Sequence, residues 1–243
     1  MSKFVDLAQK LANIPHLYLR SFDVHQLQSE LNSIDPALFV PFRSKSRHTK
    51  HLAKFWHGLS LISPGGSVHD DLTEEEYASR TDSRWTPIAE ECPYIKDVVT
   101  ELGGEGQRVR LMCVRAGGSF PWHRHGSEIS MIAGIRNGTM RPNWYEVVVH
   151  VPIRSNPQVS YEVIETSVYE LSDYSAGIDI HKRNYPEGEA WSFNAAHYHN
   201  VFNRSATEDR YSIMLTLDLR MRKTFDIVSK AVERYEGPIL TGL

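Results

Sequence analysis

The spacing of apolar residues differs between the two parts of the chain. In the first part, residues 24–34 and 94–102 carry apolar side chains every three or four positions, which predicts two amphipathic helices. Gly103-Gly104 closes the second helix. Residues 55–63 form a short apolar run that stops at Pro64-Gly65-Gly66 and is typical of a strand. The first part therefore mixes helices with at least one strand.

Between these elements lie two polar stretches. The segment 70–85 is acidic and polar, and we expect an exposed loop there. The segment 43–51 is basic. A phosphate-binding patch is one interpretation of it, but a solvated loop is favoured because no aromatic or glycine pattern accompanies the charges.

From residue 108 onward the pattern becomes that of short strands separated by turn residues. The expected strands lie within 108–114, 145–153, 159–165, 189–194 and 199–203. The clearest is 210–220, where the apolar residues Tyr211 to Leu219 alternate with Arg210, Ser212, Met214 and Thr216. An amphipathic helix is predicted over 225–235, and the tripeptide 181–183 is predicted to be a solvated turn.

Many short strands with flanking helices indicate a mainly β protein. We predict a double-stranded β-helix, or jelly roll, with the helices packed outside it. The chain is interpreted as one domain over 1–243. Within it, 1–105 supplies N-terminal helices and strands that pack on the barrel, 106–222 forms the jelly-roll catalytic core, and 223–243 holds the C-terminal helix.

Composition narrows the class of partner. A chain of 243 residues with 41% hydrophobic residues can bury a proper core, and a net charge of −3 gives no reason to expect nucleic acid. No apolar run reaches the roughly 20 residues of a membrane helix, so no membrane partner is expected. Cys92 and Cys113 are predicted to be reduced thiols of a cytoplasmic protein, because no signal peptide is recognised.

Histidines are concentrated in the β-rich part. Six of the twelve fall between residues 123 and 199. His123 and His125 stand one residue apart, so on an extended segment both side chains face the same way. A close pair combined with a distal histidine, His199, is typical of a facial metal site with open positions. Single histidines are more often surface or core groups, and by alternation alone His197 is as good a candidate as His199.

Two metal-binding jelly-roll families have motifs of this kind. The cupin pattern resembles this chain at Gly117, His123, His125 and Glu128, with the glutamate about one residue early. Its second half matches Gly188, His199 and Asn203, but Asn194 and Ala196 replace the expected proline and glycine.

The chain also resembles the aspartyl/asparaginyl β-hydroxylase-like branch of the 2-oxoglutarate and Fe(II)-dependent oxygenases, over roughly residues 55–220. Residues 110–125 resemble the strand and turn with the first metal ligand, and residues 148–163 the His-x-Pro-(Ile/Leu)-x-(Thr/Ser)-Asn strand. Residues 185–220 resemble the closing block, with Gly-Glu-x-Trp-x-Phe-Asn, His-x-Val-x-Asn and a later arginine. A cupin has no need of His150 or Arg210, whereas this branch does.

The resemblance implies Fe(II) as cofactor and 2-oxoglutarate as cosubstrate. It implies that His123, His125 and His199 bind the metal and that Arg210 and His150 bind the cosubstrate, since an arginine fork grips a carboxylate bidentately. Many oxygenases of this type have His-x-Asp where this chain has His-x-His. Coordination by His123 and His199 alone, by all three histidines, or with help from Glu128 therefore stays open. Trp122 or Trp191 is expected to wall the site.

The implied activity is hydroxylation of an amino-acid-like substrate, either a free amino acid or an Asp, Asn or Pro residue. The expected partners are this small-molecule or peptide substrate and dioxygen, with no prediction of oligomeric state. Two alternatives remain. A cupin-type metalloenzyme that does not use 2-oxoglutarate would bind metal through Glu128 and dispense with Arg210. A non-catalytic jelly roll would bind a small carboxylate without consuming oxygen.

Overall fold

The computed structural model of the chain describes residues 3–41, 55–69, 81–120, 122–123, 146–164, 179–195 and 197–240. The helices in these ranges are α1 (Lys3–Leu11), α2 (Val24–Ser33), the 3-10 turn η1 (Pro36–Leu38), α4 (Pro87–Glu90), α5 (Pro93–Leu102) and α7 (Arg222–Glu233). The strands are β1 (His16–Ser21), β2 (Val40–Pro41), β3 (Trp56–Pro64), β4 (Ser83–Trp85), β5 (Val109–Val114), β6 (Glu146–Arg154), β7 (Val159–Ile164), β8 (Ile180–Arg183), β9 (Glu189–Phe193), β10 (His199–Asn203) and β11 (Arg210–Asp218).

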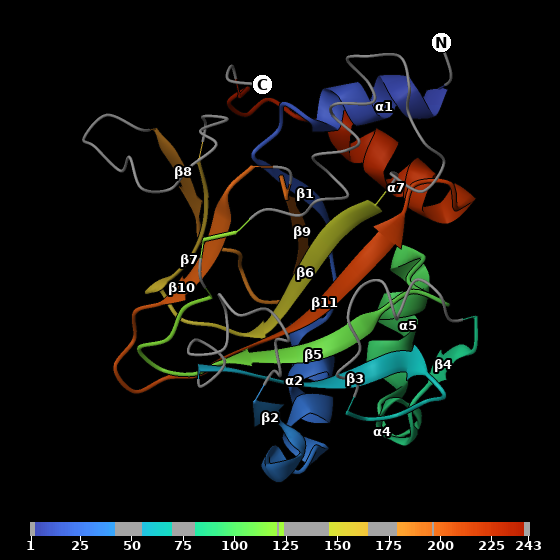
Figure 1. Cartoon of the computed structure of the whole chain (residues 1–243), viewed down its shortest axis with the longest axis vertical. Helices are drawn as coiled ribbons and strands as arrows, with labels where there is room; N and C mark the ends of the chain where they lie inside the picture. Colours follow the sequence, from blue (N-terminus) through green and yellow to red (C-terminus); the bar gives the residue numbers. More distant parts are fainter. Residues whose placement is uncertain are drawn as a thin grey trace.

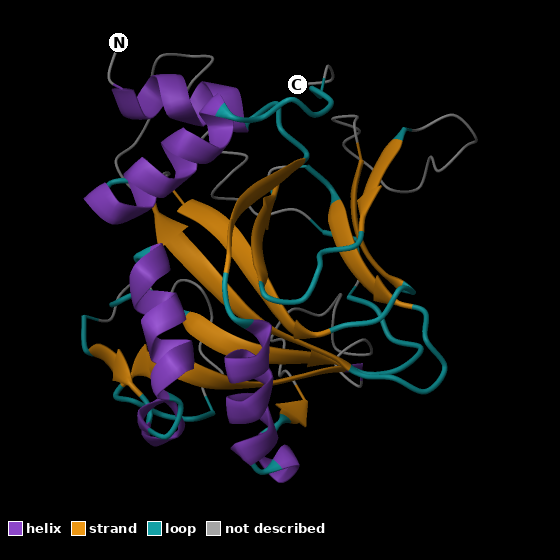
Figure 2. Ribbon diagram, turned by 180° about the vertical axis from the view of Figure 1, so that it is seen from behind, coloured by secondary structure: helices purple, strands orange, loops and turns teal. Residues whose placement is uncertain are grey.

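These strands form two antiparallel sheets. The main sheet has the order β1-β9-β6-β11-β5-β3-β2, with β4 also paired to β3, and the smaller sheet has the order β10-β7-β8. Figure 1 shows the smaller sheet on one side of the broad main sheet, and Figure 2 shows the helices on the opposite face of the main sheet. The predicted mainly β jelly roll with flanking helices is confirmed.

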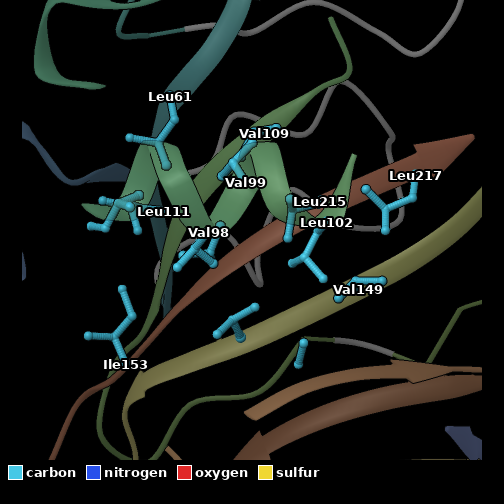
Figure 3. Close-up of a cluster of buried hydrophobic side chains, with 14 of the residues drawn as sticks. Leu61, Val98, Val99, Leu102, Val109, Leu111, Val149, Ile153, Leu215 and Leu217 are labelled. Atoms are coloured by element: carbon cyan, nitrogen blue, oxygen red, sulfur yellow. The ribbon is translucent and has the colours of Figure 1, made fainter. Parts of the chain in front are cut away.

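Strand alternation divides the buried side chains into two clusters. The outer cluster lies between the main sheet and the helices. It includes Val98, Val99 and Leu102 of α5 and Ile213, Leu215 and Leu217 of β11, as the close-up in Figure 3 shows for several of them. The inner cluster lies between the two sheets and consists of Trp56, Met112, Val114, Val148, Val159, Tyr161, Val163, Tyr185, Trp191, Phe193, Ala195 and Val201. The longer main-sheet strands β1, β3, β5, β6, β9 and β11 therefore present one face to the helices and the other to the interior of the jelly roll.

Local signals explain where the helices begin and end. Asp23 caps α2 by accepting hydrogen bonds from the backbone amides of His25 and Gln26. Gly103 ends α5 with a φ of 84°, a left-handed conformation that suits glycine. A side chain is also excluded there, because an added Cβ would lie 2.6 Å from Thr224 Oγ1 of α7. The predicted stop at Gly103-Gly104 is therefore confirmed at Gly103.

Two predictions of loop structure are wrong. Residues 83–85 form β4 and pair with the end of β3, although 70–85 was predicted to be a loop. Residues 181–183, predicted to be a turn, belong to β8, which pairs with β7. Both are short strands at sheet edges, where exposed charged residues such as Arg84 and Lys182 protect against edge-to-edge pairing and mask the strand pattern.

The N-terminal part contributes strands to the main sheet itself. β1 pairs with β9, and β3 pairs with β5. The sheet therefore draws its strands from both sides of residue 105. Residues 43–51 and 70–80 lie outside the described residues. None of the helices in the described ranges combines the length and the apolar character needed to cross a bilayer.

The two cysteines do not pair. Cys92 and Cys113 are both free and buried. Burial raises the pKa of each thiol to about 11, because the thiolate would lose its hydration. Both side chains are therefore held as neutral thiols at neutral pH.

His16 at the start of β1 ties the main sheet to the region of β8. One ring nitrogen lies 2.8 Å from the Tyr185 hydroxyl and the other 3.1 Å from the carbonyl oxygen of His181. Desolvation by burial lowers the pKa of His16 from 6.5 to about 4. The folded state thus holds this imidazole in its neutral form.

We predict a loss of stability on acidification that originates at His16. Because the pKa of His16 is lower in the folded state, its contribution to the free energy of unfolding is fully present above pH 6.5. This contribution is lost as the pH falls toward 4. The loss amounts to about 3 kcal/mol, at 1.36 kcal/mol per pKa unit. Urea unfolding at pH 7.5 and 4.5 should show a smaller difference for His16→Gln than for the wild type. The exposed-site control His25→Gln should retain the wild-type difference; an unchanged difference in His16→Gln would contradict this assignment.

Candidate metal and anion site

The interior between the sheets contains several polar groups among its apolar side chains. β11 turns Arg210 and Ser212 toward this interior, while Ile213 and Leu215 face the outer cluster. β6 turns His150 the same way, between Val149 and Val151 of the outer cluster. The alternation predicted for 210–220 is thus observed, and it places polar residues of two neighbouring strands on one inner surface.

His123 and His199 lie side by side. The amide of His123 donates to the carbonyl of His199 at 3.2 Å, and the reciprocal hydrogen bond is 2.9 Å long. The two imidazole centroids are 4.2 Å apart. Phe120 packs on the His123 ring at 4.5 Å and Phe193 on the His199 ring at 4.6 Å. The predicted pairing of the first histidine motif with a distal histidine is therefore present as a contact between the two segments.

The structure distinguishes His199 from His197. β10 begins at His199, so the alternation that made the two residues equivalent does not extend to His197. His199 Nδ1 lies 2.9 Å from the carbonyl oxygen of His197, an acceptor that requires the proton on Nδ1 and leaves the lone pair on Nε2. His197 Nδ1 lies 3.0 Å from the carbonyl oxygen of Ile164 and is thereby turned toward the end of β7.

The other ligand candidates, His125 and Glu128, lie outside the described residues. Within the residues that are described, no group of three His, Cys, Asp or Glu side chains is arranged to hold a metal. The described part of the site thus supplies two imidazoles.

Arg210 is a buried cation that has no counterion among the described residues. Its side chain is 0% exposed, and within the same part of the chain its Nε and Nη1 atoms have no hydrogen-bond partner. Its Nη2 lies 3.4 Å from His150 Nδ1, which is also 3.2 Å from Ser212 Oγ. Desolvation lowers the pKa of Arg210 to about 9. Because a buried charge is costly unless it is paired, this guanidinium is suited to receive an anion.

Tyr161 of β7 presents its aromatic ring to the Arg210 guanidinium and was not singled out from the sequence. Its ring lies 5.0 Å from the Arg210 guanidinium carbon and stacks on Tyr185 at 3.8 Å. Its hydroxyl is buried and has no hydrogen-bond partner in the described ranges. The alternating pattern of 159–165 places Tyr161 on the same face as Val159 and Val163. A hydroxyl-bearing side chain on an otherwise apolar strand face is the sequence feature that could have identified Tyr161.

A second buried arginine, Arg110, was also missed. It is 4% exposed and faces the interior from β5, paired across the sheet with Met214 and Ser60. Arg210 pairs with Val114, four residues further along β5. At about 3.3 Å per residue the two positions are roughly 13 Å apart along the strand, so they serve different parts of the interior.

Asn203 at the end of β10 holds the segment that leads to Arg210. Its Nδ2 atom donates to the carbonyl oxygens of Val114 and Glu208, at 3.0 and 2.7 Å. Its Oδ1 atom accepts from Asn156 Nδ2 at 3.1 Å. The asparagine of the His-x-Val-x-Asn motif therefore fixes the turn between β10 and β11 against β5.

The two tryptophans expected to wall the site lie apart. Trp122 packs 6.0 Å from Phe202, which alternates with Val201 on β10 and so faces away from His199. Trp191 belongs to the inner cluster and stacks on Tyr185 at 5.2 Å. Trp191 thus lines the interior, whereas Trp122 contacts the outer side of β10.

We predict that Arg210→Met does not destabilise the ligand-free protein and raises its free energy of unfolding by about 1–3 kcal/mol, because an uncompensated buried charge is removed. Succinate, used as a simple dicarboxylate, should raise the melting temperature of the wild type and leave that of Arg210→Met unchanged. Urea and thermal unfolding measure both effects, with the exposed Arg222→Met as the matched control. If Arg210→Met instead lowers the free energy of unfolding by several kcal/mol, the guanidinium is already paired in the ligand-free protein.

Comparisons with known proteins give matches in structure alone. No family model matches the chain, and no curated protein matches it in sequence. Among solved structures, the chain is similar to an oxidoreductase of the 2OG-Fe(II) oxygenase family from Burkholderia pseudomallei, with a TM-score of 0.50 and 10% identity over 89% of this chain and 91% of that chain.

Two further solved structures are similar at lower scores. One is the non-heme alpha ketoglutarate dependent epimerase SnoN from nogalamycin biosynthesis, with a TM-score of 0.48 and 8% identity over 88% of this chain and 83% of that chain. The other is a Pseudomonas putida prolyl-4-hydroxylase, with a TM-score of 0.43 and 12% identity over 88% of this chain and 98% of that chain. At these identities the likeness to the Burkholderia oxidoreductase shows a shared fold.

Proposed function

We propose that this chain is an Fe(II)- and 2-oxoglutarate-dependent dioxygenase that hydroxylates an amino-acid-like substrate. The observation that carries the proposal is the buried, uncompensated Arg210 guanidinium, which faces the same interior as the adjacent His123 and His199 rings. A site that combines a metal-binding pair with a deep cation suits a ligand that chelates the metal at one end and carries a carboxylate at the other.

The surroundings of Arg210 fit the far carboxylate of 2-oxoglutarate. Arg210 offers its unpaired Nε and Nη1 hydrogens to a carboxylate, and the Tyr161 hydroxyl offers one more donor. His150 accepts from Arg210 Nη2 through Nδ1, which orients the guanidinium. Such charge-assisted hydrogen bonds gain strength in an interior that excludes water.

The histidine pair fits a divalent metal. His199 would bind through Nε2, because its Nδ1 proton is directed to the carbonyl oxygen of His197, and this outer contact fixes the ring. His123 would be the second ligand, and we propose His125 as the third. Bound Fe(II) together with 2-oxoglutarate would supply the oxidising chemistry that converts dioxygen, the cosubstrate and a substrate C–H group into succinate, carbon dioxide and a hydroxylated product. Phe120 and Phe193 keep water away from the two rings.

The substrate class follows from the motifs. The strand 148–163 and the closing block 185–220 resemble the aspartyl/asparaginyl β-hydroxylase-like branch, which acts on amino-acid side chains or free amino acids. The fold shared with a structure of the 2OG-Fe(II) oxygenase family supports the same reaction type. We therefore propose a free amino acid or an Asp, Asn or Pro residue as the acceptor.

The cupin alternative gives Arg210 no function. A metalloenzyme that does not use 2-oxoglutarate has no reason to keep an uncompensated cation at the centre of its core, where burial is costly. A non-catalytic carboxylate-binding jelly roll would explain Arg210 but would not require adjacent imidazoles. Oxygen-dependent turnover separates the three.

We predict that anaerobically purified, Fe(II)-loaded protein forms succinate from 2-oxoglutarate when oxygen is admitted. Arg210→Met should lower kcat/KM for 2-oxoglutarate by about 100-fold, as expected from the loss of a charge-assisted bidentate contact of roughly 3 kcal/mol. His199→Gln should abolish turnover, and the control Arg222→Met should behave like the wild type. If turnover and the visible Fe(II)–2-oxoglutarate charge-transfer band are both absent while metal is bound, the proposal fails and the cupin alternative is favoured.

The role of Tyr161 has its own test. Tyr161→Phe removes one hydrogen-bond donor and keeps the ring stacked on Tyr185. We expect KM for 2-oxoglutarate to rise about tenfold with kcat nearly unchanged, because one hydrogen bond to a charged group is worth about 1.5 kcal/mol. An unchanged KM would show that the hydroxyl does not contact the carboxylate.

A further inference from the structure

The main sheet contains a gap between two neighbouring strands. β6 and β9 pair only at Val149 with Ser192 and at His150 with Trp191. Beyond Ser192 the strands separate. β6 continues along β11, with Val148 opposite Thr216, while β9 continues along β1, with Phe193 opposite His16. An opening in the ladder therefore lies directly beside the proposed cosubstrate site.

Asn194 holds the end of β9 away from β6. Its backbone amide donates to the carbonyl oxygen of Pro15 at 3.0 Å, and its side-chain Nδ2 donates to the carbonyl oxygen of Ala12 at 2.8 Å. Both acceptors belong to the turn between α1 and β1. The gap is thus built into the hydrogen bonds made by the backbone and the side chain of Asn194.

A small cavity of about 40 Å³ occupies this gap. Its walls are Leu11, Ala12, Ile14, Leu17, Val147, Val148, Ser192, Phe193, Asn194, Ala195 and Leu219. Leu17 and Leu219 belong to the outer cluster, whereas Val148, Phe193 and Ala195 belong to the inner cluster. The cavity therefore reaches from the helix side of the main sheet to its inner side.

The lining favours a small apolar occupant. Of the described residues that line it, all except Ser192 and Asn194 are apolar. Ser192 Oγ donates to the carbonyl oxygen of Phe193, and Asn194 Nδ2 donates to that of Ala12. An ordered water needs two to four polar partners, whereas apolar cavities accept gases such as xenon. One water molecule needs roughly 10–15 Å³ by this measure. The cavity therefore has room for a molecule of the size of dioxygen.

The inner end of the cavity is next to the histidine pair. Phe193 lines the cavity, and its ring lies 4.6 Å from the His199 ring. A molecule in the gap is separated from His199 by a single aromatic side chain.

We propose that the gap between β6 and β9 is a dioxygen-binding site that supplies gas to the metal from the α1 side. This inference rests on the proposed oxygenase function. On this proposal dioxygen and 2-oxoglutarate reach the metal by separate routes, because the apolar gap excludes the charged 2-oxoglutarate.

The test uses xenon as an apolar probe and dioxygen as the reactant, with the full chain. ¹²⁹Xe NMR of the wild type should show saturable binding, which Ala195→Leu should abolish by filling the gap and Val148→Ala should strengthen by widening it. In steady-state oxygen consumption, Ala195→Leu should raise KM for dioxygen several-fold with KM for 2-oxoglutarate unchanged. Val148→Ala should lower KM for dioxygen.

Ala231→Leu in α7 is the matched control, because it adds the same atoms to a buried site of the outer cluster away from the gap. It should leave xenon binding and KM for dioxygen at their wild-type values. Absence of xenon binding to the wild type, or equal KM values for dioxygen in Ala195→Leu and Ala231→Leu, overturns the gas site and leaves the oxygenase function standing. Absence of any oxygen-dependent turnover in the wild type instead refutes the proposed function, and the dioxygen assignment with it.

Discussion

The period-two alternation of β11 is the constraint on which the rest of the structure depends. One face of this strand places Ile213, Leu215 and Leu217 in the outer cluster, and the other places Arg210 and Ser212 between the sheets. A shift of register by one residue would exchange the two sets and expose a guanidinium to the apolar helices. The apolar contacts of the outer cluster therefore fix the position of the buried cation, and their burial offsets the cost of its desolvation.

The same constraint couples the anion site to the histidine pair. Asn203 joins β10, which carries His199, to the turn that leads into Arg210, through hydrogen bonds to Val114 and Glu208. Both candidate residues thus stand at the ends of strands that the Asn203 side chain ties together. Sites on strands are held more rigidly than sites on loops, and this rigidity suits a ligand that must reach two fixed points at once.

Much of this arrangement could be predicted from the sequence, because its signals are periodic. Alternation in 210–220 predicted the inward face of Arg210, and the Gly103-Gly104 stop predicted the end of α5. What could not be predicted depends on tertiary contacts. The edge strands β4 and β8 are too short and polar for alternation to show, and the burial of Arg110 depends on pairing with strands far away in the sequence. The partners of His197 likewise come from β7, which sequence spacing does not reveal.

The chemistry of the interior follows from a contrast between its two ends. Around Arg210, the Nε and Nη1 groups of the guanidinium and the hydroxyl of Tyr161 have no hydrogen-bond partner among the described residues, so an incoming carboxylate could accept hydrogen bonds there. Around His199, the neighbouring groups include the Phe193 ring and the apolar gap beside it, so a bound metal would be the group that attracts an anion there. On the proposed function, a dicarboxylate would place one end at Arg210 and present the other end to the histidine pair. Because backbone pairing within the sheets fixes both positions, we expect the length of the cosubstrate as well as its charge to matter.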